Sequence, residues 1–253
     1  MTNTIEQYYI LITRQGIKTQ GETSKKKNLL TPTSILNLQD IGSELSDFLS
    51  EKFYPEDLQI DHSGSLRALR TAKAILYGMS KYAQVKTNFE LDHLLGLCYK
   101  LVEDPRLNYP DSFSYNEPAF ERIGEKKYNT HWINNPDETR YKNKQITPFI
   151  DIMTNARAYL AHVFAETLNP DYNKKLRMVG SHSGIVEAMM FTLVNSARQM
   201  PVQKAKDIGG LFLMEENFLV ILEHNTDSDK YSALLDRHGN KYDIDINNVR
   251  NVA

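Results

Sequence analysis

Cysteine is nearly absent from this chain of 253 residues, in which Cys98 is the single example. An intrachain disulfide is therefore excluded, and a reducing, intracellular setting is favoured. Long apolar runs are missing as well, since no stretch approaches the roughly 20 residues that span a bilayer. The first residues have neither the basic flank nor the apolar stretch of a signal peptide. These absences predict a soluble, cytoplasmic protein.

A strong net charge is also missing, because 30 Lys and Arg stand against 32 Asp and Glu, a formal charge of −2. This balance provides no electrostatic basis for binding nucleic acid or a membrane surface, and we expect neither as a partner. The content of 41% apolar and 25% charged residues is ordinary for a globular protein. No internal repeat is visible. Residues 1–253 are therefore expected to form a single domain around one substantial core.

The most informative stretch runs from Tyr8 to Gly16. Its aromatic and β-branched residues predict a buried strand that stops at Arg14, Gln15 and Gly16. Open α/β sheets place their ligand sites where such strands end. Glycine lets the backbone turn sharply there, and the planar guanidinium group of arginine suits phosphate oxygens. The sequence therefore predicts an anion site at the end of this strand.

Two later segments have residues suited to the anion site expected at the end of this strand. The decapeptide at 63–72, Ser-Gly-Ser-Leu-Arg-Ala-Leu-Arg-Thr-Ala, places Arg67 at the start of a helix. The segment at 179–184, Val-Gly-Ser-His-Ser-Gly, places His182 directly after a strand. Together with the first strand, these segments resemble the histidine phosphatase superfamily, which has the phosphoglycerate-mutase-like fold. In that family the first strand ends in Arg-His-Gly, whereas this chain has Gln15 at the histidine position.

The resemblance implies a role for each of these residues. The family's histidine at the position of Gln15 is phosphorylated during turnover, so Gln15 occupies the position of the catalytic nucleophile. Arg14 and Arg67 are expected to bind the phosphate oxygens, and His182 is expected to hydrogen-bond the phosphoryl group. No metal ion or cofactor is expected. The ligand implied is a phosphorylated small molecule or a phosphoprotein.

Phosphoryl transfer also needs an acid for the leaving oxygen. The family usually has a Glu or Asp soon after the third strand, and we expect that strand at 85–91. The candidates there are Glu90, Asp92 and His93, and their spacing does not choose between them. Asp92 is preferred because a carboxylic acid resembles the usual donor. The alternative is that Asp92 is a solvated residue at the end of a strand.

The chain as a whole predicts an α/β fold, with a mainly parallel sheet flanked by helices and one antiparallel edge. The first helix is expected to open at Leu30-Thr31-Pro32, since threonine can cap a helix and proline fits its first turn. Later helices are expected at 66–77, 148–167 and 185–198. The expected strands cover 8–12, 58–61, 85–91, 176–181, 210–214 and 218–222, followed by a final hairpin that turns at Gly239-Asn240.

Residues 96–148 show no sustained hydrophobic period and are expected to form an insertion within the domain. Aromatic side chains, Tyr115 and Trp132 among them, are scattered between prolines and polar residues. A long irregular segment in a compact domain is often a lid or a binding loop. Two interpretations therefore remain: a lid that selects the ligand, and a helical elaboration that packs on the surface.

The missing Arg-His-Gly motif occurs near the C-terminus, at Arg237-His238-Gly239. It stands just ahead of Asn240, in the expected hairpin turn, and no strand–helix unit follows it. Glycine and asparagine are typical of such turns. We interpret this copy of the motif as a turn and not as a second site.

Gln15 decides between the possible functions. A carboxamide can hydrogen-bond a phosphate, but its delocalised nitrogen cannot accept a phosphoryl group as imidazole does. The chain is therefore predicted to be a pseudophosphatase that binds a phosphorylated ligand. One alternative is an inactivated variant of a phosphomonoesterase that uses a phosphohistidine intermediate. Another is that Gln15 orients a water for direct attack, as a glutamine does in small GTPases.

Overall fold

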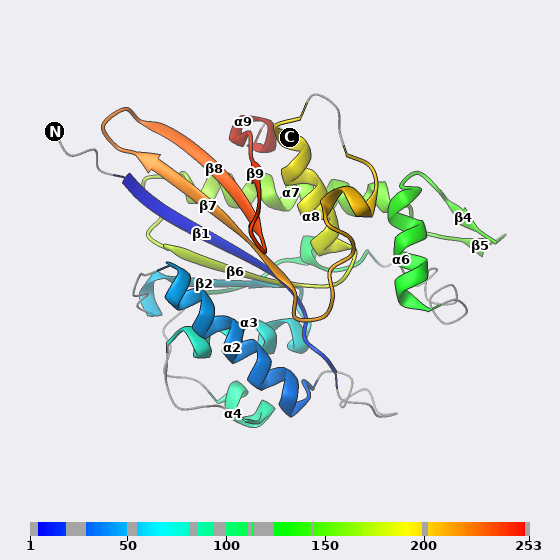
Figure 1. The fold of residues 1–253 in the computed structure, drawn as a ribbon, viewed down its shortest axis with the longest axis horizontal. Helices are drawn as coiled ribbons and strands as arrows, with labels where there is room; N and C mark the ends of the chain where they lie inside the picture. The colour runs from blue at the N-terminus through cyan, green and yellow to red at the C-terminus, as the bar shows by residue number, and fades with distance from the viewer. Residues whose placement is uncertain are drawn as a thin grey trace.

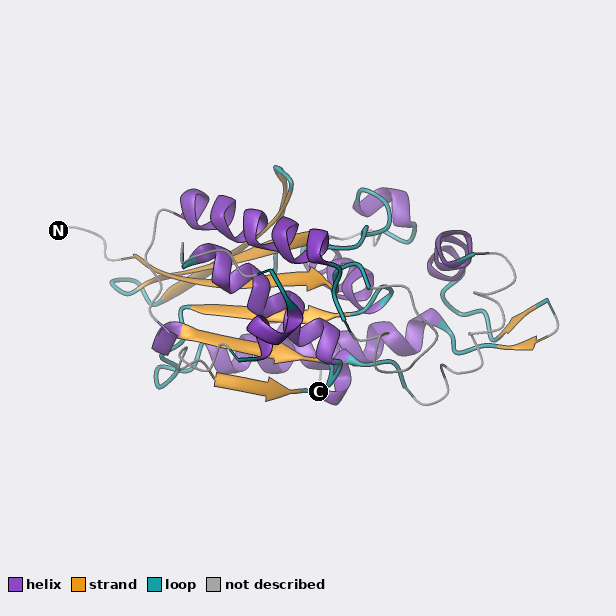
Figure 2. Cartoon of the chain, turned by 90° about the horizontal axis from the view of Figure 1, so that it is seen from below, coloured by secondary structure: helices purple, strands orange, loops and turns teal. Residues whose placement is uncertain are grey.

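The computed structural model describes residues 5–18, 29–49, 55–80, 86–93, 100–110, 113, 124–142, 144–198 and 202–250. A seven-stranded sheet in the order β3-β2-β6-β1-β7-β8-β9 runs through its centre. Helices cover both faces of this sheet, as Figure 1 and Figure 2 show. None of the helices in the described part is both long and apolar enough to cross a membrane.

The sheet has a parallel half and an antiparallel half that share β1 (Ile5–Arg14). On one side β1 pairs in parallel with β6, which pairs in parallel with β2, which pairs in parallel with β3. On the other side β1, β7, β8 and β9 form an antiparallel meander. The prediction of a parallel sheet with an antiparallel edge is confirmed. The remaining strands are β2 (Leu58–His62), β3 (Lys100–Glu103), β6 (Leu176–Ser181), β7 (Asn217–Asn225), β8 (Lys230–Arg237) and β9 (Asn240–Asp243).

Side chains of β1 alternate between two hydrophobic clusters, as expected for a strand that is buried on both faces. Tyr9 and Leu11 join the cluster that α2 and α3 cover, whereas Ile10 and Ile12 join the cluster that α7 and α8 cover. Figure 1 shows these helix pairs on opposite sides of the sheet. The principal helices are α2 (Pro32–Leu49), α3 (Leu66–Met79), α7 (Phe149–Thr167), α8 (Ile185–Ser196) and α9 (Ile246–Arg250).

Shorter elements connect these layers. Helix α6 (Glu125–Asn134) and the two-stranded sheet of β4 (Arg140–Tyr141) and β5 (Lys144–Gln145) precede α7. In the described part of the chain, 3₁₀ turns are seen at η1 (Pro55–Asp57), η2 (Pro105–Leu107) and η4 (Ala205–Ile208). Figure 1 shows α6 and the β4–β5 ribbon at the same end of the molecule.

Two predicted strands are wrong. Instead of a strand over 85–91, the structure has helix α4 (Asn88–Asp92), which begins with a capping box between Thr87 and Glu90. The third strand is Lys100–Glu103. Residues 210–214 form a loop, because Gly209 and Gly210 both adopt positive φ, at 86° and 92°. The helix expected over 185–198 ends slightly earlier, at Ser196.

The Arg-His-Gly sequence at 237–239 forms the turn of the β8–β9 hairpin, as predicted. His238 and Gly239 both adopt positive φ, at 50° and 82°, and strand β9 begins at Asn240. The Arg237 side chain is buried and donates to Glu216 at 3.0 Å. This motif therefore has a structural role between two antiparallel strands.

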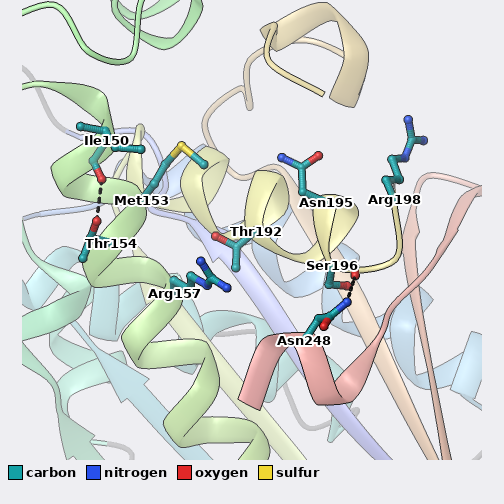
Figure 3. Close-up of a pocket in the computed structure, with 9 residues that line it drawn as sticks. All are labelled: Ile150, Met153, Thr154, Arg157, Thr192, Asn195, Ser196, Arg198 and Asn248. Atoms are coloured by element: carbon teal, nitrogen blue, oxygen red, sulfur yellow. Dashed lines mark hydrogen bonds between the residues drawn. The ribbon is translucent and has the colours of Figure 1, made fainter. Parts of the chain in front are cut away.

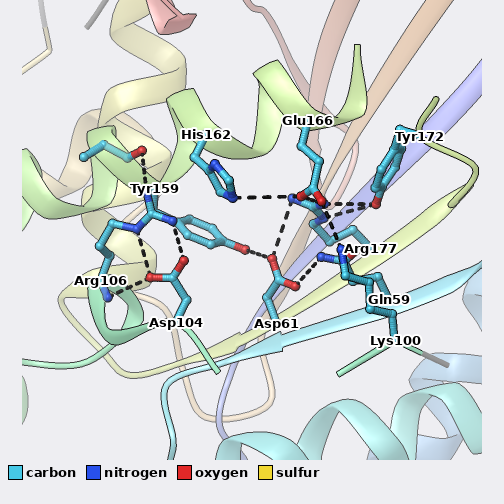
Figure 4. Close-up of polar contacts among 11 residues, drawn as sticks. Gln59, Asp61, Lys100, Asp104, Arg106, Tyr159, His162, Glu166, Tyr172 and Arg177 are labelled. Carbon is cyan, nitrogen blue, oxygen red and sulfur yellow. Dashed lines mark hydrogen bonds and ion pairs between the residues drawn. The ribbon is translucent and has the colours of Figure 1, made fainter. Parts of the chain in front are cut away.

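A buried polar network ties the parallel half of the sheet to α7 (Figure 4). Tyr159 donates to one carboxylate oxygen of Asp61 at 2.7 Å, and Gln59 donates to the other at 2.7 Å. Arg177 lies 3.7 Å from Asp61 and also pairs with Glu166. These residues belong to β2, β6 and α7, so the network links two strands of the sheet to the helix that packs on them.

Helices α2 and α3 touch backbone to backbone at two glycines. A Cβ atom added at Gly42 would lie 2.0 Å from the carbonyl oxygen of Ile75. A Cβ atom added at Gly78 would lie 1.9 Å from the carbonyl oxygen of Gln39. Neither backbone can yield without separating the helices, so the close approach requires glycine at both positions.

We predict that Gly42→Ala lowers the free energy of unfolding by about 1–3 kcal/mol, because the added methyl group overpacks the helix contact. Urea denaturation measures this change. The matched control is Ser43→Ala on the same helix, for which a change below about 0.5 kcal/mol is expected. An unchanged unfolding midpoint for Gly42→Ala would show that α2 and α3 do not pack this closely.

Candidate functional site

The carboxyl ends of three parallel strands meet at one edge of the sheet. In the β1–β6 ladder Arg14 lies opposite Ser181, and in the β2–β6 ladder His62 lies opposite Gly180. The residues that follow these strands, Gln15, Ser63 and His182, are therefore neighbours although they are far apart in sequence. Ligand sites of open α/β sheets form at such edges.

A chain of hydrogen bonds joins the predicted site residues. Arg67 donates through Nε to the amide oxygen of Gln15 at 2.9 Å. The amide nitrogen of Gln15 lies 2.8 Å from Nδ1 of His182, and Nε2 of His182 lies 3.0 Å from the hydroxyl of Ser63. Since the amide oxygen accepts from Arg67, the amide nitrogen donates to Nδ1. The proton of the neutral imidazole is then on Nε2, from which it is donated to Ser63.

Arg14 stands next to this chain of hydrogen bonds. Its backbone N–H donates to the carbonyl oxygen of Glu216 at 3.0 Å, and its guanidinium group donates to the carbonyl oxygen of Phe212. The positive charges of Arg14 and Arg67 both act on His182. The structure thus brings together four residues that the sequence predicted for the site: Arg14, Gln15, Arg67 and His182.

The pKa of His182 is lowered from 6.5 to about 4. Burial is the largest cause, and the positive charges of Arg67 and Arg14 act in the same direction. The imidazole is therefore neutral at pH 7. Between pH 6.5 and about 4 the unfolded chain binds this proton more readily than the folded chain, so His182 reduces the stability of the fold as the pH falls through that window.

The decapeptide at 63–72 also positions the turn after Gln15. The hydroxyl of Thr71 accepts from the backbone N–H of Gly16 at 2.9 Å and donates to the carbonyl oxygen of Arg67 at 2.8 Å. Helix α3 crosses β6 at Gly180, where an added Cβ atom would lie 2.6 Å from the carbonyl oxygen of Ala68. These contacts hold the start of α3, and Arg67 with it, against the ends of β1 and β6.

Asp92, the preferred acid, lies in a different setting from the one expected. It ends helix α4, and both of its carboxylate oxygens accept from Arg70, at 2.9 and 2.6 Å. Arg70 is buried, so this bidentate pair attaches α4 to α3. Glu90 is also occupied, because it accepts from the backbone N–H groups of Lys86 and Thr87. The imidazole ring of His93 packs against the ring of Phe89, with the two centroids 3.9 Å apart.

Glu103 was missed as an acid candidate because the third strand was expected too early. It ends β3 and lies opposite His62 in the β2–β3 ladder. A Cβ atom added at Gly64 would lie 2.6 Å from its Oε1, so the carboxylate rests against the loop between Ser63 and α3. Its side chain is exposed at the edge of the candidate site. The short β-prone run Lys-Leu-Val at 100–102, ahead of Glu103, was the available signal.

The segment at 96–148 contacts the residues around His182. The ring of Tyr109 lies 5.2 Å from the ring of His182, between centroids, and its hydroxyl donates to the carbonyl oxygen of Ser183. Asn129 donates to the hydroxyl of Ser183 at 3.0 Å. Trp132 is fully buried and packs close to Gly184, so it belongs to the core. Tyr115 lies outside the described residues.

A buried carboxylate organises the loop that holds Arg14. Glu187, in the first turn of α8, accepts from the backbone N–H of Gly184 at 2.5 Å and from that of Phe212 at 3.0 Å. Burial raises its pKa, and the charge of Arg14 opposes this shift. Glu187 therefore fixes the backbone of Phe212, whose carbonyl oxygen receives the guanidinium group of Arg14.

A separate cavity of about 370 Å³ lies between α7, α8 and α9 (Figure 3). Its lining includes Arg157, Thr192, Asn195 and Asn248, and it contains none of the predicted site residues. Within the described ranges, no cluster of three or more His, Cys, Asp or Glu is arranged to hold a metal ion.

We predict that Arg67→Met raises the pKa of His182 above about 4, because it removes one of the two positive charges that disfavour the imidazolium form. Titration of the imidazole resonances by NMR measures the shift. Arg157→Met, which removes an exposed arginine on α7, is the matched control and should leave this pKa unchanged. An unchanged pKa of His182 in Arg67→Met would show that the charge of Arg67 does not act on this imidazole.

Comparison with solved structures finds this architecture at low sequence identity. Mycobacterial hydrolase 2 aligns with a TM-score of 0.53 and 12% identity over 97% of this chain and 96% of its own. Mycobacterial glucosyl-3-phosphoglycerate phosphatase aligns with a TM-score of 0.50 and 12% identity over 91% of this chain and 97% of its own. No family model and no curated protein matches the sequence. These likenesses concern the fold alone: the chain shares the α/β architecture of these two proteins, which is the phosphoglycerate-mutase-like fold that its motifs imply.

Proposed function

We propose that this chain is a pseudophosphatase that binds a phosphorylated small molecule or a phosphoprotein at Arg14, Arg67 and His182. One observation carries the proposal: the side chain of Gln15 occupies the nucleophile position between Arg67 and His182, hydrogen-bonded to both. The groups that would neutralise a phosphate are present around it. The group that would attack phosphorus is not.

The chemistry of the carboxamide supports this assignment. Covalent catalysis needs a lone pair that can attack phosphorus, which a neutral imidazole nitrogen has and an amide nitrogen lacks. Removing a covalent nucleophile lowers turnover by orders of magnitude, whereas the residual binding groups continue to act. Gln15 is also similar in size to histidine, and it hydrogen-bonds both Arg67 and His182.

Two alternatives use the same site. An inactivated variant of a phosphomonoesterase would differ only at Gln15, with Glu103 as its leaving-group acid. A glutamine that orients water would need its amide oxygen directed at that water. In this structure the amide oxygen accepts from Arg67 and the amide nitrogen donates to His182, which favours a binding role over water activation.

We predict that the unaltered chain binds inorganic phosphate and that Arg67→Met weakens this binding by tenfold or more. The reason is that a charge-assisted hydrogen bond to an oxyanion is worth about 1.5–3 kcal/mol. Isothermal titration calorimetry measures the affinity. Arg157→Met is the matched control, and it should bind phosphate as the unaltered chain does. Equal affinities for the two variants would place the anion elsewhere and contradict the proposal.

We predict that Gln15→His creates phosphomonoesterase activity if the rest of the site is intact, a result that would favour the inactivated-variant alternative. The imidazole nitrogen would attack phosphorus, Arg14 and Arg67 would stabilise the transferring oxygens, and Glu103 would protonate the leaving alcohol oxygen. Acid-quench trapping detects the phosphohistidine formed in the first step. Release of phosphate from p-nitrophenyl phosphate measures the complete reaction, in which water then hydrolyses that intermediate. Gln15→Asn is the matched control and should remain inactive.

The acid assignment is tested in the Gln15→His background. Glu103→Gln is expected to reduce hydrolysis by about 10²–10⁴-fold, whereas Asp92→Asn should have little effect beyond loosening α4. His182→Asn should also abolish activity. An inactive Gln15→His that still binds phosphate would reject the inactivated-variant alternative. Appreciable turnover by the unaltered chain would reject the pseudophosphatase.

A further inference from the structure

An open groove of about 650 Å³ runs between helix α2 and the loop that leads into β7. Three of its apolar side chains are unusually exposed: Phe48 at 60%, Leu213 at 63% and Met214 at 38%. Single exposed apolar residues are common on protein surfaces, but a contiguous group in a concave site is typical of a binding surface. The other apolar side chains of the groove are Ile41, Leu45 and Leu219.

Helix α2 contributes a stripe of apolar residues to this groove. Ile41, Leu45 and Phe48 follow one another at helical spacing, so they lie along one side of the helix. Ile41 and Leu45 are partly buried against the core beneath, whereas Phe48 extends to the surface. The core accounts for the base of the stripe but not for its exposed end.

The rim of the groove is acidic. Among the described residues, its lining includes Glu44, Glu215, Glu216 and Asp236, and His238 is the single basic side chain. The carboxylate of Glu216 is already paired: its Oε1 lies 3.0 Å from Nη2 of Arg237 and 3.3 Å from Nε2 of His238. Within the described part of the chain, Glu44 and Glu215 form no ion pair. The surface around the apolar stripe is therefore negatively charged although the whole chain is nearly neutral.

Glu215 is an unusual residue within this rim. Its φ angle is 70°, a left-handed conformation that costs a non-glycine residue about 1–2 kcal/mol. The side chain is 9% exposed; Oε2 accepts from Asn37 at 3.2 Å, whereas Oε1 has no hydrogen-bond partner. A buried carboxylate oxygen without a hydrogen-bond partner is unfavourable, and it adds negative charge beneath this rim.

We propose that this groove docks an amphipathic, basic segment of a partner protein. Leucine-like side chains would cover Phe48, Leu213 and Met214, and Lys or Arg side chains would pair with the exposed carboxylate of Glu44. Complementary charge would steer the encounter, and the apolar contact would supply most of the affinity. The proposal does not depend on phosphate binding, because nothing in this groove is suited to an anion.

The groove adjoins the candidate phosphate site through a single loop. Residues 213–216 line the groove, Phe212 just before them accepts from Arg14, and the carbonyl oxygen of Glu216 accepts from the backbone of Arg14. A partner seated in the groove would therefore lie beside the strand end that carries Arg14 and Gln15. Such a partner is placed to present a nearby phosphorylated residue to that site.

The test uses the full chain and a fluorescently labelled synthetic helix with leucines on one face and lysines on the other. Fluorescence anisotropy is expected to show saturable binding that weakens as salt is added, because the charge pairs are screened. Phe48→Asp and Leu213→Asp should each weaken binding at least tenfold. The matched control is Phe89→Asp, since Phe89 is 69% exposed but lies on α4, outside the groove.

Charge reversal provides a second comparison. Glu44→Lys should weaken binding of the basic peptide several-fold at low salt, whereas Asp40→Lys, on the same helix but outside the groove, should have a smaller effect. A peptide with glutamate in place of each lysine should not bind. Circular dichroism of every variant verifies that the fold is retained.

Four results would overturn the proposal. The first is no saturable binding of the basic peptide. The second is equal binding by Phe48→Asp and Phe89→Asp, and the third is displacement of the peptide by inorganic phosphate, which would place it at the Arg14–Gln15 site. The fourth is dimerisation of the chain in sedimentation velocity that Phe48→Asp abolishes, because the groove would then be an interface between two copies.

Discussion

The register between β1 and β6 is the constraint on which the candidate site depends. Because Arg14 lies opposite Ser181, the residues after the two strands, Gln15 and His182, are close enough for a 2.8 Å hydrogen bond. A shift of one residue would turn the side chains of β1 to the opposite faces of the sheet and separate this pair. The two hydrophobic clusters prevent such a shift, since alternate side chains of β1 are buried in each.

The strongest sequence signals predicted both the strand ends and their meeting. Tyr8–Gly16, the decapeptide at 63–72 and the segment around His182 combine local pattern with a family resemblance, and the structure places all three at one edge of the sheet. The third strand was misplaced because 85–91 has β-prone residues, while a capping box at Thr87 and Glu90 favours a helix there. Because of that error, Glu103 at the end of the true third strand was not considered as the acid. Contacts such as Asp92 with Arg70 depend on tertiary packing, which no local pattern encodes.

The site is electrostatically unbalanced in a way that suits an anion. Two guanidinium groups act on an imidazole that stays neutral at pH 7, and the buried carboxylate of Glu187 accepts from backbone N–H groups. Gln15 satisfies Arg67 and His182 without adding charge of its own. A glutamine at position 15 is thus compatible with a site whose polar groups are hydrogen-bonded to one another.

The buried network of Asp61, Tyr159 and Arg177 limits how this fold can change over evolutionary time. Arg177 is 1% exposed and Asp61 is 2% exposed, so replacing Arg177 alone would leave the charge of Asp61 inside the protein without its cation. Replacing both with apolar residues of similar volume avoids that penalty. Substitutions at these two positions should therefore be inherited as pairs, and covariation between strands β2 and β6 would mark this core even in relatives whose active-site motifs have diverged.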